Sequence, residues 1–410
     1  ADILSRYRDE VVGRCGIREF VDDQLIAPVA DEEVEVYLDR DISFNVADEA
    51  TARTIADSDP AHTLISEDSE SGEWIVTRLA GSLARVPRRA ALSRTVGGQF
   101  PRDFDPQRWG IPASMTESLD RIASWNLVTA VEAFLNAGFS PAELLQAVHP
   151  ADVASTQGTG FGGMESMRKM FVGRFLNEER PSDILQEALP NVGAAHVMQS
   201  FIGGYGSMVQ PVSACATAAV SIEEGWDKIA LGKAQVVVAG AIDDISVESV
   251  VGFGNMNATA EAAVMKAKGI SPRHFSRAND RRRGGFVEAQ GGGTVILARG
   301  DVAAKLGLPV AAVLGFVSSY ADGAHTSIPA PGLGALAAGR GGSNSRLAKS
   351  LAKLGVEPDD IAVVSKHDTS TGANDPNESE LHTRLARALG RSEGNPLVAV
   401  SQKTITGHAK

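Results

Sequence analysis

Apolar runs of the kind that form buried β-strands recur along this chain from residue 112 onward, and helical segments separate them. The runs are rich in Val, Ile and Ala, and several are continuous rather than alternating, which is typical of strands covered on both faces. Candidate strands occupy residues 234–240, 292–299, 310–320, 361–368 and 396–403. Residues 347–355 and 377–390 have helical spacing. This order predicts an α/β architecture with buried, layered sheets.

A long helix is predicted ahead of these strands. Ser114 and Glu117 have the spacing of a capping box, and apolar residues follow them at helical intervals. Gly138 ends the pattern, as a glycine does at the end of many helices. The wide apolar face predicts that this helix packs against a sheet.

Residues 1–110 differ in character. The first 100 residues hold 20 acidic and 11 basic side chains. Residues 34–46 alternate like a strand, residues 66–73 are polar like a loop, and residues 74–81 have the pattern of a further strand. Residues 85–106 are rich in turn residues and indicate an extended linker. We therefore expect an acidic linker or insert at residues 1–110 and a core domain at residues 111–410.

Composition and charge exclude several classes of protein. A hydrophobic share of 43% with 22% charged residues is ordinary for a soluble globular protein. No apolar run reaches the roughly 18 residues of a membrane-spanning helix, and no signal peptide is evident. A net charge of −12 makes nucleic acid a poor partner. Two cysteines in 410 residues predict a reducing compartment, the cytoplasm. The basic cluster at residues 277–285 indicates a salt-bridged loop or a docking site for an acidic carrier protein.

Cys215 stands where an extended apolar segment meets the start of a helix, among small residues. Unpaired amides and the dipole at a helix N-terminus favour a thiolate, so we expect the pKa of this thiol to be lowered. The same amides are suited to hold an oxyanion. The alternative is a buried structural cysteine, and the local sequence leaves both open.

Two histidines follow predicted strands in loops rich in Gly and Thr. His367 follows the run at 361–366, and His408 follows the run at 396–403, with Lys403 five residues before it. Ligand-handling groups of α/β proteins gather at such strand ends. We therefore predict that both histidines share one site with Cys215, although a core position is the alternative for each.

The segment GTGFGG at residues 158–163 matches a dinucleotide-binding pattern. The strand before it is short, and the next acidic residues, Glu178 and Glu179, lie in a charged loop rather than at a strand end. We interpret the segment as a tight turn, with a nicotinamide-binding domain as the weaker alternative. The sequence has no P-loop, HExxH or CxxC pattern, and no metal site is predicted.

Together these motifs resemble the β-ketoacyl synthase domain of type I fatty acid synthases, the barrel-shaped kind of fungi and actinobacteria. The resemblance rests on VSACATAAVSIEEG around Cys215, KHDTSTGANDPNE around His367 and SQKTITGHAK around His408, in that order. Residues 156–163, 275–297 and 322–332 also match family segments. The match is strong from about residue 110 to the end of the chain.

The resemblance implies a thiolase-like fold with α-β-α-β-α layers, incomplete at both ends of this chain. It implies a decarboxylative condensation in which Cys215 carries the acyl chain and its amide forms half of an oxyanion hole. His367 and His408 would donate hydrogen bonds to an enolate oxygen, and Lys403 would orient them.

Further roles follow from the same resemblance. Thr369 and Thr371 would bind the phosphopantetheine arm of an acyl carrier protein, and the domain would bind no cofactor of its own. Partners would be the acyl carrier protein domain, other domains of the same multienzyme, and a second synthase copy within a larger, hexameric assembly.

Two departures from the family stand out. Asp368 occupies a position where most relatives carry Gly, and its effect on His367 is open. The second oxyanion donor and a gating Phe would lie beyond Lys410, so we expect the chain to be inactive alone. The alternatives are a non-catalytic scaffold piece of the synthase wall, a polyketide-type ketosynthase and a cysteine hydrolase.

Overall fold

The computed structural model describes residues 2–21, 29–171, 184–322 and 332–410. Contacts divide the chain into two compact units, one made of Ala1–Ile26 and Ser93–Lys410, the other of Ala27–Leu92. The smaller unit lies within the region that the sequence assigns to a linker or insert. The functional boundary at residue 110 stays a prediction.

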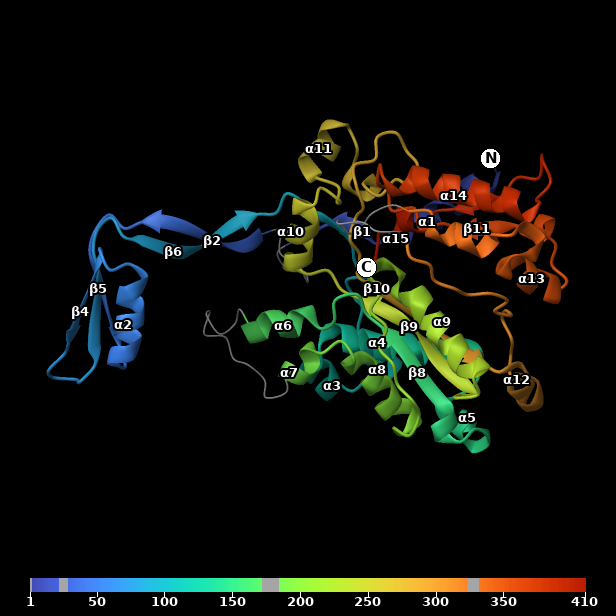
Figure 1. The fold of residues 1–410 in the computed structure, drawn as a ribbon, viewed down its shortest axis with the longest axis horizontal. Helices are drawn as coiled ribbons and strands as arrows, with labels where there is room; N and C mark the ends of the chain where they lie inside the picture. Colours follow the sequence, from blue (N-terminus) through green and yellow to red (C-terminus); the bar gives the residue numbers. More distant parts are fainter. Residues whose placement is uncertain (1, 22–28, 172–183, 323–331) are drawn as a thin grey trace. The chain divides into compact units, whose positions relative to one another are not determined.

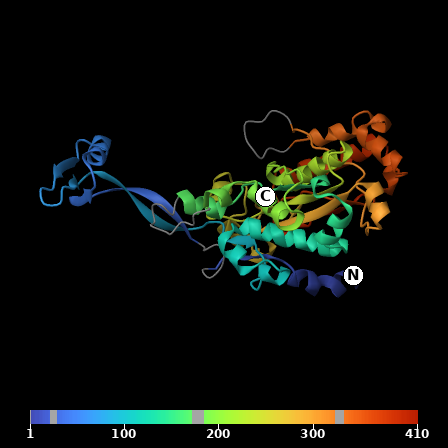
Figure 2. The same ribbon diagram turned by 90° about the horizontal axis from the view of Figure 1, so that it is seen from below.

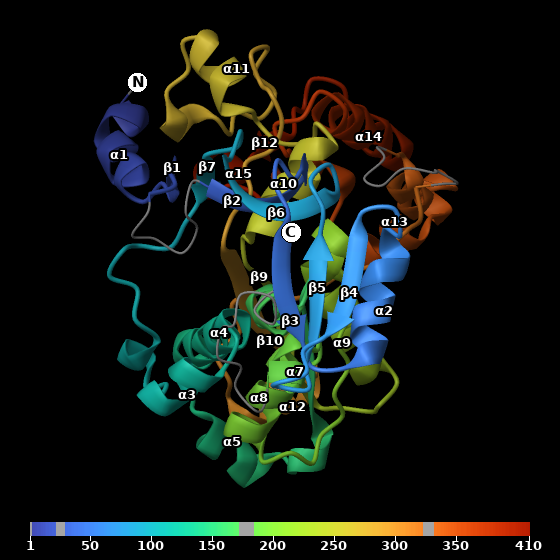
Figure 3. The ribbon, with the colours of Figure 1, turned by 90° about the vertical axis from the view of Figure 1, so that its left-hand side faces the viewer.

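The smaller unit combines an antiparallel sheet with one helix (Figure 3). β5 (Trp74–Arg78) pairs with both β3 (Ile42–Val46) and β4 (Thr63–Glu67), and α2 (Glu49–Ser58) packs on this sheet. A second pair joins β2 (Val29–Tyr37) to β6 (Leu83–Ala91). The single strand predicted at 34–46 is therefore two strands, because the turn at 38–41, which has charged residues at 39–41, breaks it. The predicted linker at 85–106 is wrong in part, since β6 and β7 (Val96–Gly98) pair with neighbouring strands.

The larger unit contains a sheet in the order β10-β9-β8 (Figure 1). β8 (Val153–Gly158) runs parallel to β9 (Val236–Asp243), and β10 (Gly291–Ala298) runs antiparallel to β9. The predicted strands at 234–240 and 292–299 are confirmed. Every residue of β9 is buried, as its continuous apolar run predicted.

Alternate residues of β9 pack into different apolar clusters, as the period of two in a strand requires. Val236 and Val238 lie in one cluster with residues of α4 (Arg121–Ala137). Val237 and Ala239 lie in another cluster, against residues of α9 (Thr217–Ala230). The two helices thus cover the two faces of this sheet (Figure 2).

The helix predicted from Ser114 is interrupted. α3 (Ala113–Ser118) is short, and α4 begins after Asp120, whose carboxylate accepts the Ile122 amide at 3.1 Å. The predicted capping box is wrong, because Pro112 occupies the N-cap of α3 and Asp120 caps the long helix. The predicted end is confirmed, since Gly138 has a left-handed backbone with φ of 76°.

A second sheet pairs β11 (Val363–Ser365) with β12 (Val398–Val400) in parallel. Both strands are shorter than the runs at 361–368 and 396–403 that predicted them. The run at 310–320 forms no strand in the described structure, and Val313 is 72% exposed. A run of β-type residues becomes a strand only when a neighbour pairs with it. The helices of this part are α13 (Arg346–Lys353), α14 (Asn374–Leu389) and α15 (Lys403–Thr406).

Other elements of the larger unit surround these sheets. β1 (Ile17–Glu19) pairs with β7. The remaining helices are α1 (Asp2–Gly13), α5 (Pro141–Ala147), α6 (Met164–Phe171), α7 (Ile184–Ala188), α8 (Val192–Val197), α10 (Val247–Asn255), α11 (Ala262–Ala267) and α12 (Gly300–Leu306). Across the described ranges, none of the helices combines the length and the apolar character that a membrane crossing requires.

Candidate active site

Cys215 lies in a 3-10 turn, Ala214–Ala216, that leads directly into α9. Its predicted position at the start of a helix is confirmed. Ala214 has φ of 46°, a left-handed conformation that costs a residue with a Cβ on the order of 1 kcal/mol. Thr217 stabilises the turn, because its hydroxyl accepts the Ser213 amide at 2.9 Å and donates to the Ala214 carbonyl at 2.7 Å.

His408 is placed by a sharp turn after α15. Gly407 has φ of 79°, and a Cβ there would lie only 3.0 Å from the Cβ of Ala289. The His408 amide donates to the Val287 carbonyl at 2.7 Å, and the His408 carbonyl accepts the Ala289 amide at 2.9 Å. These bonds bring the buried imidazole to Cys215, where Nε2 lies 3.1 Å from Sγ.

His367 and Lys403 follow the paired strands of the second sheet. β11 and β12 are parallel, so their carboxyl ends lie at one edge, as predicted for ligand-handling loops. Lys403 Nζ lies 2.7 Å from His367 Nδ1. An ammonium group only donates, so Nδ1 is the acceptor and the neutral ring carries its proton on Nε2.

The structure brings the three predicted side chains together. Sγ of Cys215 and one ring nitrogen each of His367 and His408 all lie within 4.8 Å of one another. The two rings are 5.1 Å apart at their centroids and perpendicular. A Cys-His-His set is also one that Zn²⁺ uses, although no metal site was predicted from the sequence. The positive charge of the Lys403 ammonium beside His367 disfavours the binding of a metal cation by these three side chains.

Burial controls the charge state of both imidazoles. It lowers the pKa of His367 to about 4, and the Lys403 charge adds to this effect. Burial likewise lowers the pKa of His408 far below its usual value, with Lys403 and His367 contributing. Both rings are therefore neutral hydrogen-bond donors at pH 7. Burial also lowers the pKa of Lys403 to about 8.

The expected lowering of the Cys215 pKa is wrong in direction. Burial removes water from the sulfur and raises the pKa of the thiol, and the Asp243 carboxylate adds to this. Lys403 opposes the rise without cancelling it. The sequence places the sulfur at a helix start, but it does not show how far the folded chain shields the sulfur atom from water. The resting group at neutral pH is the thiol.

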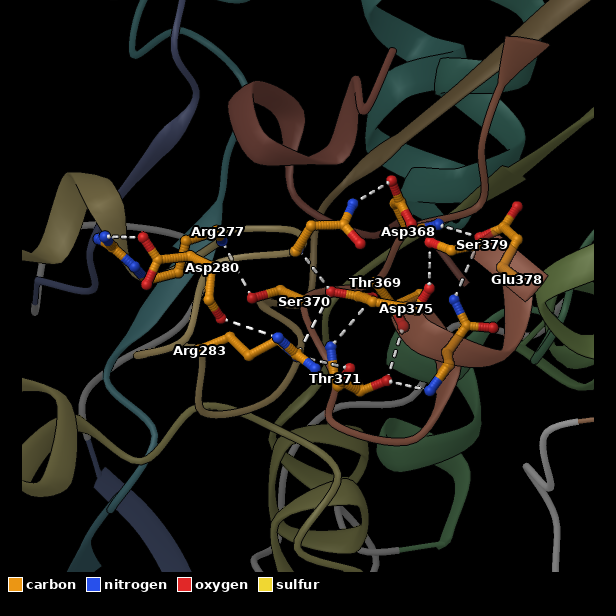
Figure 4. A network of polar contacts seen from close by, with 12 residues as sticks. Arg277, Asp280, Arg283, Asp368, Thr369, Ser370, Thr371, Asp375, Glu378 and Ser379 are labelled. Atoms are coloured by element: carbon orange, nitrogen blue, oxygen red, sulfur yellow. Dashed lines mark hydrogen bonds and ion pairs between the residues drawn. The ribbon is translucent and has the colours of Figure 1, made fainter. Parts of the chain in front are cut away.

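Thr369 and Thr371 lie on the loop that begins with His367 (Figure 4). Their hydroxyl oxygens are 3.2 Å apart, and the Thr371 hydroxyl accepts the Asn374 amide at 3.0 Å. Ser370 between them has φ of 67°, so the two threonine side chains are presented by a tight turn. Their predicted contact with a phosphopantetheine arm stays a prediction.

Two carboxylates of this loop and α14 were not assigned from the sequence. The two oxygens of Glu378 accept the His367 amide at 2.6 Å and the Asp368 amide at 2.7 Å. Burial opposes ionisation of Glu378, but hydrogen bonds from His382 and these amides outweigh it and lower the pKa to about 2. The fully buried Asp375 accepts the Asn279 amide at 2.8 Å. Both lie in the NDPNE segment at residues 374–378. Carboxylates at the start of a predicted helix were the feature of the sequence that could have identified them as parts of the site.

The GTGFGG segment closes around an internal carboxylate. Asp243, the last residue of β9, accepts the Thr159 hydroxyl at 2.8 Å and the amides of Gly160 and Phe161. Burial raises the pKa of Asp243 to about 6 against these donors. Because the loop amides bind Asp243, they are not available to a pyrophosphate, and the interpretation as a tight turn accounts for the segment.

Comparison with known families identifies the family to which the chain belongs. Residues 44–303 match the beta-ketoacyl synthase N-terminal domain, and residues 310–410 match the beta-ketoacyl synthase C-terminal domain. The chain belongs to the β-ketoacyl synthase family. The fold class expected from the resemblance is confirmed, and the ketosynthase chain is homologous to the condensing domains of fatty acid synthases.

Curated relatives of this ketosynthase chain are much longer proteins. It is 35% identical over 419 residues to a fatty acid synthase alpha subunit of Emericella nidulans, covering all of this chain and 26% of that protein. It is 34% identical over 417 residues to fatty acid synthase 2 of Mycosarcoma maydis, covering all of this chain and 11% of that protein. The chain thus spans about a quarter or less of the length of these relatives.

Solved ketosynthase structures share the fold. FabY of P. aeruginosa, a ketosynthase, aligns with a TM-score of 0.81 at 22% identity, over all of this chain and 63% of that one. A beta-ketoacyl synthase of Burkholderia phymatum aligns with a TM-score of 0.61 at 25% identity, over 78% of this chain and 72% of that one. The ketosynthase chain therefore has the thiolase-like layered fold.

Proposed function

We propose that this chain is the condensing component of a type I fatty acid synthase, a 3-oxoacyl-[acyl-carrier-protein] synthase. The observation that carries the proposal is the contact of Cys215 Sγ with His408 Nε2 at 3.1 Å, with His367 gathered beside them. A soft nucleophile next to two neutral N–H donors suits acyl transfer followed by enolate formation. The relatives named as fatty acid synthases support the type I assignment.

The first half-reaction loads the acyl chain. The Cys215 sulfur attacks the thioester carbonyl of the acyl carrier, forms a new C–S bond and displaces the phosphopantetheine sulfur. The thiol proton passes to that departing sulfur. Amides at the start of α9 stabilise the charge that develops on the carbonyl oxygen. The raised thiol pKa keeps the sulfur protonated until a substrate is bound.

The second half-reaction forms the new carbon–carbon bond. A malonyl thioester loses CO₂, and the electron pair of the broken bond moves to the thioester oxygen as an enolate. His367 and His408 donate to this oxygen through Nε2–H, and Lys403 keeps the His367 proton on that nitrogen. Because both rings are neutral, they stabilise the enolate without protonating it. The enolate carbon then attacks the acyl-Cys215 carbonyl and expels the Cys215 thiolate.

The proposed partners of the protein are inferred from its much longer relatives, which are named as fatty acid synthases. The chain takes its substrates on the phosphopantetheine arm of an acyl carrier protein domain, with Thr369 and Thr371 as its contacts. Its other partners are further domains of the same multienzyme and a second synthase copy. They belong to a hexameric assembly in the cytoplasm. The chain binds no cofactor of its own in this scheme.

Acylation mapping tests this function. We expect a radiolabelled acyl thioester to label the full-length polypeptide on the peptide that contains Cys215 and, once malonyl thioester is added, to yield a 3-oxoacyl product. Cys15→Ala is the matched control, since Cys15 Sγ donates to the Ile405 carbonyl and does not belong to the site. Label on Cys15, or release of free fatty acid in place of condensation, would refute the proposal.

A further inference from the structure

Asp368, the residue after His367, is a carboxylate in an unfavourable place. It is fully buried, and its φ of 31° is a conformation that a glycine adopts more easily. Burying a carboxylate costs several kcal/mol unless partners compensate it. Stability alone does not account for this residue, because buried ion pairs contribute little to stability compared with apolar replacements.

The partners of Asp368 come from three separate segments. One oxygen, Oδ1, lies 2.7 Å from Nζ of the buried Lys366. The other, Oδ2, accepts Nδ2 of Asn279 at 2.8 Å and the hydroxyl of Ser401. We call Asp368 with Lys366, Asn279 and Ser401 the Asp368 clamp, part of which Figure 4 draws.

The clamp joins both ends of the bond between Lys403 and His367. Asp368 is covalently attached to His367, and Ser401 lies two residues before Lys403. The Ser401 carbonyl also accepts the Thr404 amide at 3.2 Å, in the first turn of α15. A shift of Ser401 relative to Asp368 would therefore change the 2.7 Å separation of Lys403 Nζ and His367 Nδ1.

Lys366 extends the clamp to α14. Its Nζ donates to the Ser379 hydroxyl at 3.0 Å, and Ser379 lies one residue after Glu378, which accepts the His367 and Asp368 amides. The backbone amide of Lys366 donates to the Val400 carbonyl at 3.0 Å and so continues the pairing of β11 with β12. Among the described residues, none of the bonds of Asp368 reaches Cys215 or His408.

We propose that Asp368 is a positioning residue that holds Lys403 in register with His367, and thereby fixes the His367 Nε2–H donor for enolate formation. This inference rests on the proposed condensing function. It predicts that the clamp matters for malonyl decarboxylation, which uses the histidines, and not for reaction of the Cys215 sulfur, which lies in the turn before α9.

Paired variants of the full-length polypeptide separate positioning from folding. Asp368→Gly alone leaves the Lys366 ammonium buried without its carboxylate, so Lys366→Met/Asp368→Gly removes both charges. In this double variant we expect CO₂ release from malonyl thioester to fall about 10-fold, because small misplacements of catalytic groups are costly. We expect alkylation of Cys215 by iodoacetamide to stay within about twofold, because none of the bonds described for Asp368 reaches Cys215 and the variant keeps the Lys403 charge.

Two further variants calibrate the result. Lys366→Met/Asp368→Asn keeps an oxygen that accepts from Ser401, so it should recover part of the lost CO₂ release. Asp359→Asn is the matched control, because Asp359 also binds a serine, Ser392, but does so at an exposed position in the 3-10 helix Pro358–Asp360. It should leave both rates unchanged.

The outcomes distinguish the two proposals. A parent enzyme that releases no CO₂ from malonyl thioester refutes the condensing function, and the clamp with it. A parent that does so while Lys366→Met/Asp368→Gly keeps the full rate refutes the clamp alone. An equal fall of both rates, together with a lowered melting temperature, shows a purely structural role and also overturns the proposal.

Discussion

The two sides of the candidate site are held in different ways. Cys215 lies in the turn that leads into α9, and α9 packs on a sheet whose central strand, β9, is buried along its whole length. His367, His408 and Lys403 follow a sheet of short strands, where Val363 and Val398 are 55% and 56% exposed. The first side has an apolar core, whereas the second is fixed by polar groups such as the fully buried Asp368 and the partly exposed Glu378.

Different forces therefore set the two halves of the chemistry. Apolar packing gives the nucleophile a fixed place but also removes water from it, which raises its pKa. Hydrogen bonds and ion pairs orient rings and decide which nitrogen carries a proton, at the cost of desolvating charges. Substitutions that change a charge, and changes of pH, should therefore mainly affect the histidine side of the site. Substitutions that leave a cavity in the apolar core should mainly affect the cysteine side.

The largest expected effect comes from removing the nucleophile. Cys215→Ala in the full-length polypeptide should reduce condensation by at least about 1,000-fold, as the loss of a nucleophile does in other enzymes. Decarboxylation of malonyl thioester should persist, because His367 and His408 remain. Product analysis by mass spectrometry with CO₂ trapping measures both. Undiminished condensation would favour the scaffold interpretation instead.

Removing the Lys403 ammonium should affect the histidine side of the site. Without Nζ at Nδ1, His367 is no longer held in the Nε2–H form, so Lys403→Met should slow CO₂ release about 100-fold, a usual size for a proton-handling group. Lys349→Met, at an exposed position of α13, is the control and should have no effect. An unchanged rate in Lys403→Met would show that another group sets the His367 tautomer.

A matched pair of valines compares the two sheets directly. Val238 in β9 has no exposed surface, so Val238→Ala should lower the free energy of unfolding by about 2 kcal/mol. Val398→Ala in β12 should change it by less than about 0.5 kcal/mol. Denaturant titration of the full-length polypeptide measures both. A cost at Val398 equal to that at Val238 would show that the second sheet is covered as closely as the first.

Predictions from the sequence were best where a local pattern of residues is compatible with only one kind of structure. The continuous run of β9 and the glycine end of α4 were predicted, and the motifs around Cys215, His367 and His408 led to the residues that the structure gathers. Burial is a tertiary property, which is why the direction of the Cys215 pKa was missed. Asp120 was preferred over Ser114 as a cap because its carboxylate also accepts the Ser166 amide from a distant segment.

The smallest expected effect is a pH dependence that differs between the two sides. Burial lowers the pKa of Lys403 to about 8 and raises that of the Cys215 thiol. As pH rises through about 8, Lys403 loses its proton and its hold on the His367 tautomer, so CO₂ release should fall, by at most about tenfold per pH unit. Alkylation of Cys215 should rise over the same range, because the thiolate fraction grows. Below neutral pH the CO₂ rate should stay level until His367 titrates at about 4.

Cys215→Ala tests whether the Cys215 sulfur contributes to the pH dependence of CO₂ release. The fraction of Cys215 that is ionised near pH 8 raises the pKa of Lys403, so removing the sulfur should move the fall in CO₂ release slightly to lower pH. Rates measured in one buffer series at constant ionic strength show the shift. If CO₂ release instead climbed with pH in parallel with alkylation, the thiolate would control both steps, and the separation of the site into an apolar side and a polar side would not hold.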